Sequence, residues 1–281
     1  TMSAALGGIV GIFEMPNTNP LTTTPEALEH KIKRGTETAY TDFAYYFGGT
    51  FENSKNLPSW EKLDGVCGIK IFMGASTGNL LSATDEEVEA VVANGNRVIA
   101  VHAEDEFLMN ENKKTILKDS NDVGMHCKWR DVNSSLNATK RVVSLAKKHN
   151  RHVHVLHITT AEEMDYLRNH KDTATVEVLP NHLTFHAPDC YELLGTLAQQ
   201  NPPIREKHHQ DALWQAINDG TVDIVASDHA PHTLEEKSGT YPNTPSGTPG
   251  VQTLLPVMLN HAANGKLSYE RVVELMAYGP I

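Results

Sequence analysis

Short apolar runs of strand length recur along the chain, and longer segments of helical character separate most of them. The runs are rich in Val, Ile and Ala and do not alternate strictly with polar residues. Near-continuous apolar runs are typical of strands that are covered on both faces, as in a parallel sheet. The pattern therefore predicts seven strands, at residues 8–15, 43–49, 66–73, 97–102, 152–158, 173–179 and 222–227.

The intervening segments predict helices. The first opens with Thr24 and Pro25, a typical N-cap followed by a first-turn proline. Alternating strands and helices indicate an α/β fold, and seven such units predict a (β/α)8 TIM-type barrel whose first strand is missing from this chain. A doubly wound open sheet is the alternative, but the glycine-rich loop that usually follows its first strand is absent from the sequence. Helices are predicted at residues 24–39, 84–94, 133–149, 160–170, 190–199 and 206–219.

The length of the chain, 281 residues, fits one barrel domain. Neither a long repeat nor a low-complexity linker divides it, so we expect a single catalytic domain over residues 1–281. The sequence opens inside a helical pattern at Thr1 and stops at Ile281 without a closing element. We therefore expect the domain to be truncated at both ends.

Composition narrows the class of partner. Lys and Arg total 24 against 35 for Asp and Glu, a net charge of −11, and no basic cluster with interleaved aromatics indicates nucleic-acid binding. No apolar run approaches the roughly 20 residues that span a bilayer, so we expect no membrane partner. The cysteines, Cys67, Cys127 and Cys190, are odd in number and lack C-x-x-C spacing. This pattern predicts a cytoplasmic protein and argues against a cysteine zinc site.

The most informative motif is Ser227-Asp228-His229-Ala230-Pro231-His232, which follows the last predicted strand. Carboxylate oxygens and imidazole nitrogens both bind Zn²⁺, and a carboxylate beside a metal-bound water can accept its proton. The alternative is a surface loop in which Asp228 caps a turn. Candidate metal ligands at the ends of other predicted strands favour the metal site over the surface loop.

Two histidines also end predicted strands. His102 ends the fourth strand, and His157 lies at the end of the fifth. The carboxyl ends of barrel strands form one face, so these side chains are expected to converge there. Strand alternation places His157 on the face opposite His154. We predict His157 as the ligand because it lies nearest the strand end, with His152 and His154 in packing or supporting roles.

Lys70 stands inside the apolar run Ile69-Lys70-Ile71-Phe72. An isolated buried ammonium is very costly, so this lysine must reach solvent, pair with an acid or be chemically altered. A buried lysine of lowered pKa can react with CO₂ to give a carbamate, an anion able to bridge two metals. The presence of His102, His157 and Asp228 at the ends of other predicted strands favours the carbamate.

These motifs together resemble the amidohydrolase superfamily and, within it, dihydroorotases of the long bacterial type and of multifunctional pyrimidine-synthesis polypeptides. The resemblance covers nearly the whole chain. It implies an amidohydrolase barrel, a cytoplasmic metal-dependent hydrolase and a homodimer. The markers are residues 14–20, 68–74, 101–104, 154–158, 201–205 and 227–232.

The resemblance implies a role for each matching residue. Lys70 matches a carbamylated lysine that bridges two zinc ions, and His102 and His157 match ligands of the second zinc. Asp228 matches the aspartate that binds the first zinc and shuttles the proton. The family's His-x-His pair has no counterpart here, in keeping with a missing first strand. The family's substrate-contacting positions correspond in this sequence to Asn17, Thr77, Asn201, His232, Ser246 and Gly247.

The implied reaction is the reversible hydrolysis of L-dihydroorotate to N-carbamoyl-L-aspartate, a step of pyrimidine biosynthesis. A hydroxide bridging the metals attacks the ring carbonyl, with Asp228 as proton shuttle. One alternative is a related cyclic amidase, allantoinase or hydantoinase. The other is a non-catalytic scaffold for a partner such as a transcarbamoylase, which is disfavoured because Lys70, His102, His157 and Asp228 are all present.

Overall fold

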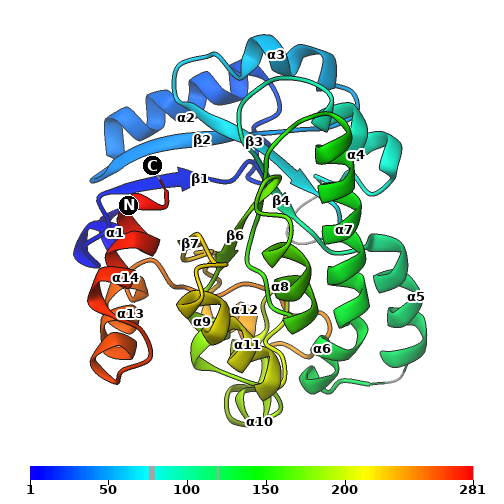
Figure 1. Ribbon diagram of the computed structural model, residues 1–281, viewed down its shortest axis with the longest axis vertical. Helices are drawn as coiled ribbons and strands as arrows, with labels where there is room; N and C mark the ends of the chain where they lie inside the picture. Colours follow the sequence, from blue (N-terminus) through cyan, green and yellow to red (C-terminus); the bar gives the residue numbers. More distant parts are fainter. Residues whose placement is uncertain (76–79, 119, 281) are drawn as a thin grey trace.

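The computed structural model describes residues 1–75, 80–118 and 120–280. Its centre is a sheet of seven parallel strands that are hydrogen-bonded in chain order (Figure 1). The strands are β1 (Gly11–Glu14), β2 (Asp42–Gly48), β3 (Val66–Phe72), β4 (Ile99–His102), β5 (Val153–Val155), β6 (Ala174–Val178) and β7 (Ile224–Val225).

Helices connect the strands and cover the outer side of the sheet (Figure 1). Within the described ranges, no helix is both long enough and apolar enough to span a membrane. The α-helices are α1 (Met2–Leu6), α2 (Pro25–Thr38), α3 (Leu57–Trp60), α4 (Asp85–Val92), α5 (Glu106–Ile116), α6 (His126–Trp129), α7 (Val132–Lys148), α8 (Ala161–Arg168), α9 (Pro180–Thr184), α10 (Asp189–Leu194), α11 (Lys207–Asn218), α12 (Leu234–Lys237), α13 (Leu254–Ala263) and α14 (Tyr269–Val273). Short 3₁₀ turns η1 (Ser54–Asn56), η2 (Val123–Met125) and η3 (Gly195–Ala198) and the π-helical η4 (Glu274–Tyr278) complete the set.

The predicted elements are confirmed in order and type. Each predicted strand overlaps one observed strand, with β2 beginning one residue before its predicted start, and the six predicted helices correspond to α2, α4, α7, α8, α10 and α11. The strands follow one another across the sheet without the reversal of order that defines a doubly wound fold, so that alternative is excluded. The α/β class is confirmed, while a further strand beyond the described ones stays a prediction.

The sheet curls into a half-barrel, with its two faces in different surroundings (Figure 1). Ile69 and Ile71 of β3 and Val153 of β5 are fully buried in the apolar layer that the helices cover. Burying each such side chain contributes about 1.5–3 kcal/mol. Because side chains alternate along a strand, Lys70 points to the inner face.

The register across the sheet defines a row of inward-facing residues. Lys70 pairs with Ala100, Ala100 with His154, and His154 with Thr175. Two residues further along β4, on the same face, stands His102. The inner face therefore carries a lysine and two histidines from three neighbouring strands.

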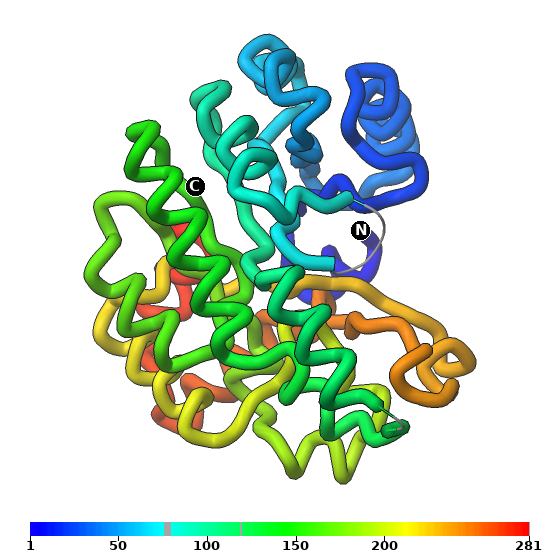
Figure 2. The backbone as a smooth tube through the Cα atoms, turned by 90° about the vertical axis from the view of Figure 1, so that its right-hand side faces the viewer, coloured from blue at the N-terminus to red at the C-terminus, as the bar shows by residue number. Residues whose placement is uncertain are grey.

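The connection between β7 and α13 runs from residue 226 to residue 253. Figure 2 shows this segment, in yellow and orange, running away from the sheet and returning before α13. It contains only the short helix α12, which Thr233 caps by a reciprocal hydrogen-bond pair with Glu236. The connection carries His232, Ser246 and Gly247, three of the predicted substrate-binding residues.

Candidate active site at the carboxyl edge of the sheet

His102 and His157 face each other at the carboxyl edge of the sheet. His102 Nδ1 lies 3.1 Å from His157 Nε2, and the rings meet edge to face with centroids 4.8 Å apart. Both rings are buried, and burial lowers the pKa of each, which favours the neutral form that binds metals. Two Zn–N bonds of the usual length at a tetrahedral angle leave about 3.3 Å between the nitrogens. The pair therefore fits a shared metal ion.

The orientation of His157 corrects one prediction. Alternation places it on the face opposite His154, but β5 ends at Val155 and His157 has a φ of 40°, in the left-handed region. The side chain consequently turns to His102, which lies on the same face as His154. The prediction was wrong because alternation holds only within a strand. A left-handed non-glycine residue is strained, and such strain clusters at functional sites.

Lys70 lies on the inner face of β3 with 1% of its surface exposed. Its Nζ lies 4.4 Å from the centroid of the Phe72 ring. Burial lowers the pKa of Lys70 to about 7, although the negative charges of Asp228 and Glu177 oppose the shift. At neutral pH a large fraction of this amine is therefore unprotonated and nucleophilic.

Asp228 follows β7 and, like His157, has a positive φ, 42°. The residue is exposed at its surface, yet protein atoms crowd its carboxyl group and displace bulk water from it. Burial, followed by the charge of Glu177, raises the pKa of Asp228 to about 6, although the charge of Lys70 opposes the shift. A carboxyl group with this pKa can both accept and release a proton near neutral pH.

Glu177 is a buried carboxylate of this site that the sequence reasoning missed. Its Oε1 accepts a hydrogen bond of 3.2 Å from the backbone N–H of His157, and its Oε2 lies 3.4 Å from His154 Nε2. Thr175, two residues earlier on β6, lies 2.9 Å from His154 Nδ1. The alternation of polar and apolar residues over 174–178 was the available signal. It places Thr175 and Glu177 together on the inner face.

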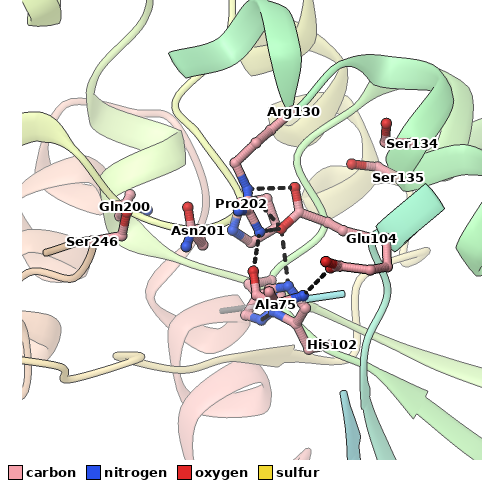
Figure 3. Close-up of polar contacts among 12 residues, drawn as sticks. Ala75, His102, Glu104, Arg130, Ser134, Ser135, Gln200, Asn201, Pro202 and Ser246 are labelled. Carbon is pink, nitrogen blue, oxygen red and sulfur yellow. Dashed lines mark hydrogen bonds and ion pairs between the residues drawn. The ribbon is translucent and has the colours of Figure 1, made fainter. Parts of the chain in front are cut away.

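A buried ion pair between Arg130 and Glu104 lies next to His102. Arg130 Nε donates a 3.1 Å hydrogen bond to Glu104 Oε1, and its Nη2 donates to the backbone oxygen of Ala75 at 2.9 Å (Figure 3). Glu104 Oε2 lies 2.9 Å from His102 Nε2, without the angle of a hydrogen bond. Burial alone raises the pKa of Glu104, but Arg130 and His102 outweigh it and hold the pKa well below the usual range. Carboxylates commonly orient metal-binding histidines in this way.

The loops that carry the predicted substrate-binding residues are joined. His232 Nε2 lies 3.2 Å from the backbone oxygen of Ser246, and the Gly247 N–H donates to the backbone oxygen of Gln199 at 3.0 Å. Buried Lys237 donates to the backbone oxygens of Gln199 and Gly247 at 2.9 and 3.1 Å. These bonds hold the loop at 246–247 against the chain segment that leads to residue 201.

The other predicted substrate-binding residues are Asn201, Asn17 and Thr77. Asn201 is buried, and its Oδ1 lies 2.9 Å from His126 Nε2. Figure 3 shows Asn201 and Ser246 lying to one side of the row formed by Arg130, Glu104 and His102. Asn17 is half-buried and follows β1 at the carboxyl edge. Thr77 lies outside the described residues.

A cavity of about 280 Å³ opens beside these loops. Its walls include His232 and Gly247, together with apolar side chains such as Leu197 and Ile204. Neither Lys70 nor His102 lines it, so this cavity is distinct from the histidine pair. Across the described part of the chain, no three His, Cys, Asp or Glu side chains converge as a metal site. The candidate centre thus depends on the histidine pair together with Lys70 and Asp228.

Comparison with known proteins gives relatives by sequence and by structure. No family model matches the chain. A dihydroorotase from Methanosarcina acetivorans is 34% identical over 289 residues, which cover 99% of this chain and 61% of that protein. The L-hydantoinase from Paenarthrobacter aurescens is 31% identical, with 99% and 63% covered. The chain thus spans less than two thirds of the length of these relatives.

The solved structures extend the comparison to the fold. L-hydantoinase (dihydropyrimidinase) from Arthrobacter aurescens superimposes with a TM-score of 0.93 at 30% identity, over 99% of this chain and 64% of that one. Dihydroorotase from Saccharomyces cerevisiae, in complex with 5-fluoroorotic acid, gives a TM-score of 0.76 at 16% identity, over 99% and 77%. The second likeness concerns the fold alone. The predicted (β/α)8 barrel class is confirmed. The similarity in sequence to dihydroorotases and to an L-hydantoinase supports the amidohydrolase superfamily for this chain.

Proposed function

We propose that this protein is a zinc-dependent cyclic amide hydrolase, and specifically a dihydroorotase. It would hydrolyse L-dihydroorotate reversibly to N-carbamoyl-L-aspartate, a step of pyrimidine biosynthesis. The observation that carries the proposal is the approach of His102 Nδ1 to His157 Nε2, at 3.1 Å, on the face that also carries buried Lys70. Four dihydroorotases at 31–34% identity over nearly the whole chain support it.

The residues present fit a metal centre. His102 Nε2 and His157 Nδ1 are buried without a hydrogen-bond partner in the described structure, so the only hydrogen bond that the described residues make to either ring is the one between His102 Nδ1 and His157 Nε2. Lys70, His102, His157 and Asp228 would hold the metal, with Lys70 supplying an anionic oxygen as a carbamate. When bound, two zinc ions provide a water of lowered pKa and polarise the ring carbonyl.

Proton transfer falls to Asp228. With a pKa of about 6, its carboxylate is mostly ionised at pH 7 and can accept the proton of the attacking water. The same group then donates that proton to the amide nitrogen that leaves when the ring C–N bond breaks. Glu177 keeps the pKa of Asp228 raised, which makes the second transfer easier.

Substrate orientation falls to the loops beside the histidine pair. We propose that Asn17, Thr77, Asn201, His232, Ser246 and Gly247 contact the substrate. The substrate is an anion and the whole chain carries −11, so recognition of its carboxylate must come from local donors. His232 stands next to the Ser246 backbone and Gly247 at the cavity wall, which supports this role.

A second candidate is hydantoin hydrolysis. The L-hydantoinase from Arthrobacter aurescens superimposes better, at a TM-score of 0.93, than the yeast dihydroorotase at 0.76. The apolar walls of the nearby cavity also suit a ring with an apolar substituent. Both candidates use the same centre and differ in the group that the loops recognise.

The experiment is a parallel assay of ring opening by the full-length, zinc-loaded protein. L-dihydroorotate, an L-5-substituted hydantoin and allantoin are tested at equal concentration. Turnover of dihydroorotate alone is expected. Faster turnover of the hydantoin would replace the first candidate with the second. Failure on all three substrates with zinc still bound would favour a non-catalytic scaffold.

A further inference from the structure

We propose that His126 is a positioning residue that fixes the side chain of Asn201 with its amide nitrogen free to donate to the ligand. The inference deepens the proposed function and rests on it for the identity of the ligand. It concerns the groups behind the substrate loop and not the metal centre. Four hydrogen bonds carry the inference, because the chemistry of their partners fixes their directions.

His126 lies on α6 with 1% of its surface exposed. Its Nε2 lies 3.0 Å from the backbone oxygen of Gln200 and 2.9 Å from Asn201 Oδ1. A backbone carbonyl oxygen only accepts hydrogen bonds, so Nε2 must carry the hydrogen and donate it. In a neutral ring Nδ1 then has no hydrogen and acts as an acceptor.

The hydrogen bond at Nδ1 of the same ring is consistent with placing the hydrogen on Nε2. His126 Nδ1 lies 3.3 Å from the hydroxyl of Tyr241, which itself accepts a 2.7 Å hydrogen bond from Trp129 Nε1. An indole N–H only donates, so the Tyr241 hydroxyl uses its lone pair for Trp129 and its hydrogen for His126. The chain of bonds thus runs in one direction, from the Trp129 indole to the Gln200 carbonyl.

The ring stays neutral over the working pH range. Burial, together with the nearby charge of Arg130, lowers the pKa of His126 to about 3. Tyr241, which packs on the ring edge to face, is also buried. The Nε2–H tautomer is therefore retained at neutral pH, and Nδ1 remains an acceptor for Tyr241.

The Nε2–H tautomer of His126 determines how the side-chain amide of Asn201 is oriented. An amide side chain can turn over and exchange its oxygen and nitrogen, but only the oxygen can accept from His126 Nε2. The amide nitrogen is thereby directed away from His126, and it has no hydrogen bond within the described ranges. Asn201 consequently presents a donor, which suits a carboxylate or a ring carbonyl of the ligand. Without His126, the amide loses this preference.

The test is a double-mutant cycle on the full-length, metal-loaded protein, with KM and kcat for L-dihydroorotate as readouts. His126→Leu removes the donor, and we expect KM to rise about tenfold, the loss of one hydrogen bond, while kcat changes far less. His126→Gln keeps an N–H at this place and should recover most of the loss. In an Asn201→Ala background, His126→Leu should raise KM no further.

Two outcomes would overturn the inference. One is a folded His126→Leu variant with the KM of the wild type. The other is an equal rise of KM with and without the Asn201 side chain, because a merely structural role acts additively. If His126→Leu does not fold, His126→Phe removes the donor with a ring of similar size. An unchanged KM in that variant also contradicts the inference.

The tautomer can be tested separately from the substrate. In ¹⁵N spectra of the wild-type protein at pH 7, His126 should show a protonated Nε2 and an unprotonated Nδ1. A protonated Nδ1 would refute the positioning role even if dihydroorotate is the substrate. The expected tautomer in a protein that does not turn over dihydroorotate would leave the Asn201 orientation standing, and the proposed function would fail instead. The cycle would then be run with the hydantoin.

Discussion

His102 and His157 are 55 residues apart in the chain, yet His102 Nδ1 and His157 Nε2 lie 3.1 Å from each other in the interior. A direct hydrogen bond satisfies only one nitrogen of each ring, and the opposite nitrogens, His102 Nε2 and His157 Nδ1, have no hydrogen bond in the described structure. A metal ion between the two facing nitrogens would use both lone pairs at once. This relationship carries the proposed metal centre.

Lys70→Ala should lower the zinc content of the purified protein to less than about half, because the bridging anion is lost. Metal is counted by mass spectrometry after exhaustive dialysis. Short carboxylic acids such as propionate should restore part of the zinc and part of the activity by occupying the place of the carbamate. The matched control is Lys237→Met, another buried lysine, which should keep its zinc. Full zinc in Lys70→Ala would contradict the bridging role.

Asp228→Asn should reduce kcat about 10²–10⁴-fold, because the amide can neither accept nor return the proton. The melting temperature should change little, since the residue is exposed at its surface. The kcat and the thermal unfolding curve are measured for the same preparation. The exposed Asp172 provides the control, and Asp172→Asn should retain wild-type kcat. If kcat survives in Asp228→Asn, another group moves the proton.

Much of the fold was predictable because apolar runs determine strands in a parallel sheet. The same runs located the residues at the carboxyl edge, since barrel topology brings strand ends together regardless of their separation in sequence. Lys70 and His102 are buried on the inner face as this reasoning requires. Nothing in the pattern measures distance, so the 3.1 Å approach of the histidines needed the structure.

Other features were beyond sequence patterns for physical reasons. The turn of His157 depends on a single φ of 40° after the end of β5, where strand periodicity no longer applies. The Glu104–Arg130 pair joins two connecting segments, whose paths no apolar period predicts. His126 gains its role only because the chain at Gln200 passes beside it. Each case depends on how loops pack, not on local propensity.

His232→Ala should raise the KM for L-dihydroorotate more than it lowers zinc content. His232 stands at the cavity wall and 3.2 Å from the Ser246 backbone, away from the histidine pair. Loss of a hydrogen bond to a charged carboxylate costs about 1.5–3 kcal/mol, so KM should rise at least tenfold. The exposed His208 serves as the control through His208→Ala. An unchanged KM would remove His232 from carboxylate recognition.

Arg130→Met should destabilise the fold by about 3–5 kcal/mol, because it leaves the Glu104 carboxylate buried without its partner. Glu104 has 0% and Arg130 3% of its side-chain surface exposed. The free energy of unfolding is measured by urea titration of the metal-free protein. The double variant Arg130→Met/Glu104→Gln should recover part of the loss by removing the charge. A single variant as stable as the wild type would show that solvent reaches Glu104.

His126 should make the fold sensitive to mild acid. Its pKa is about 3 in the folded protein and about 6.5 when unfolded, so the unfolded chain binds the extra proton first as pH falls. The contribution is complete above pH 6.5 and is lost as pH falls from there towards 3, by about 1.4 kcal/mol per pH unit. Between pH 7 and 5 the wild type should therefore lose about 2 kcal/mol more of its unfolding free energy than His126→Gln.

Urea titrations of the metal-free proteins at the two pH values measure this difference. The groups that set the charge around His126 are Arg130 and Glu104, and both persist in the variant, so their contributions cancel in the comparison. His208→Gln removes an exposed imidazole and should follow the wild-type pH dependence. Parallel curves for wild type and His126→Gln would mean that the buried ring is protonated in the fold. Nδ1 would then donate rather than accept, and the direction of hydrogen bonding from Trp129 through Tyr241 to His126 would fail with it.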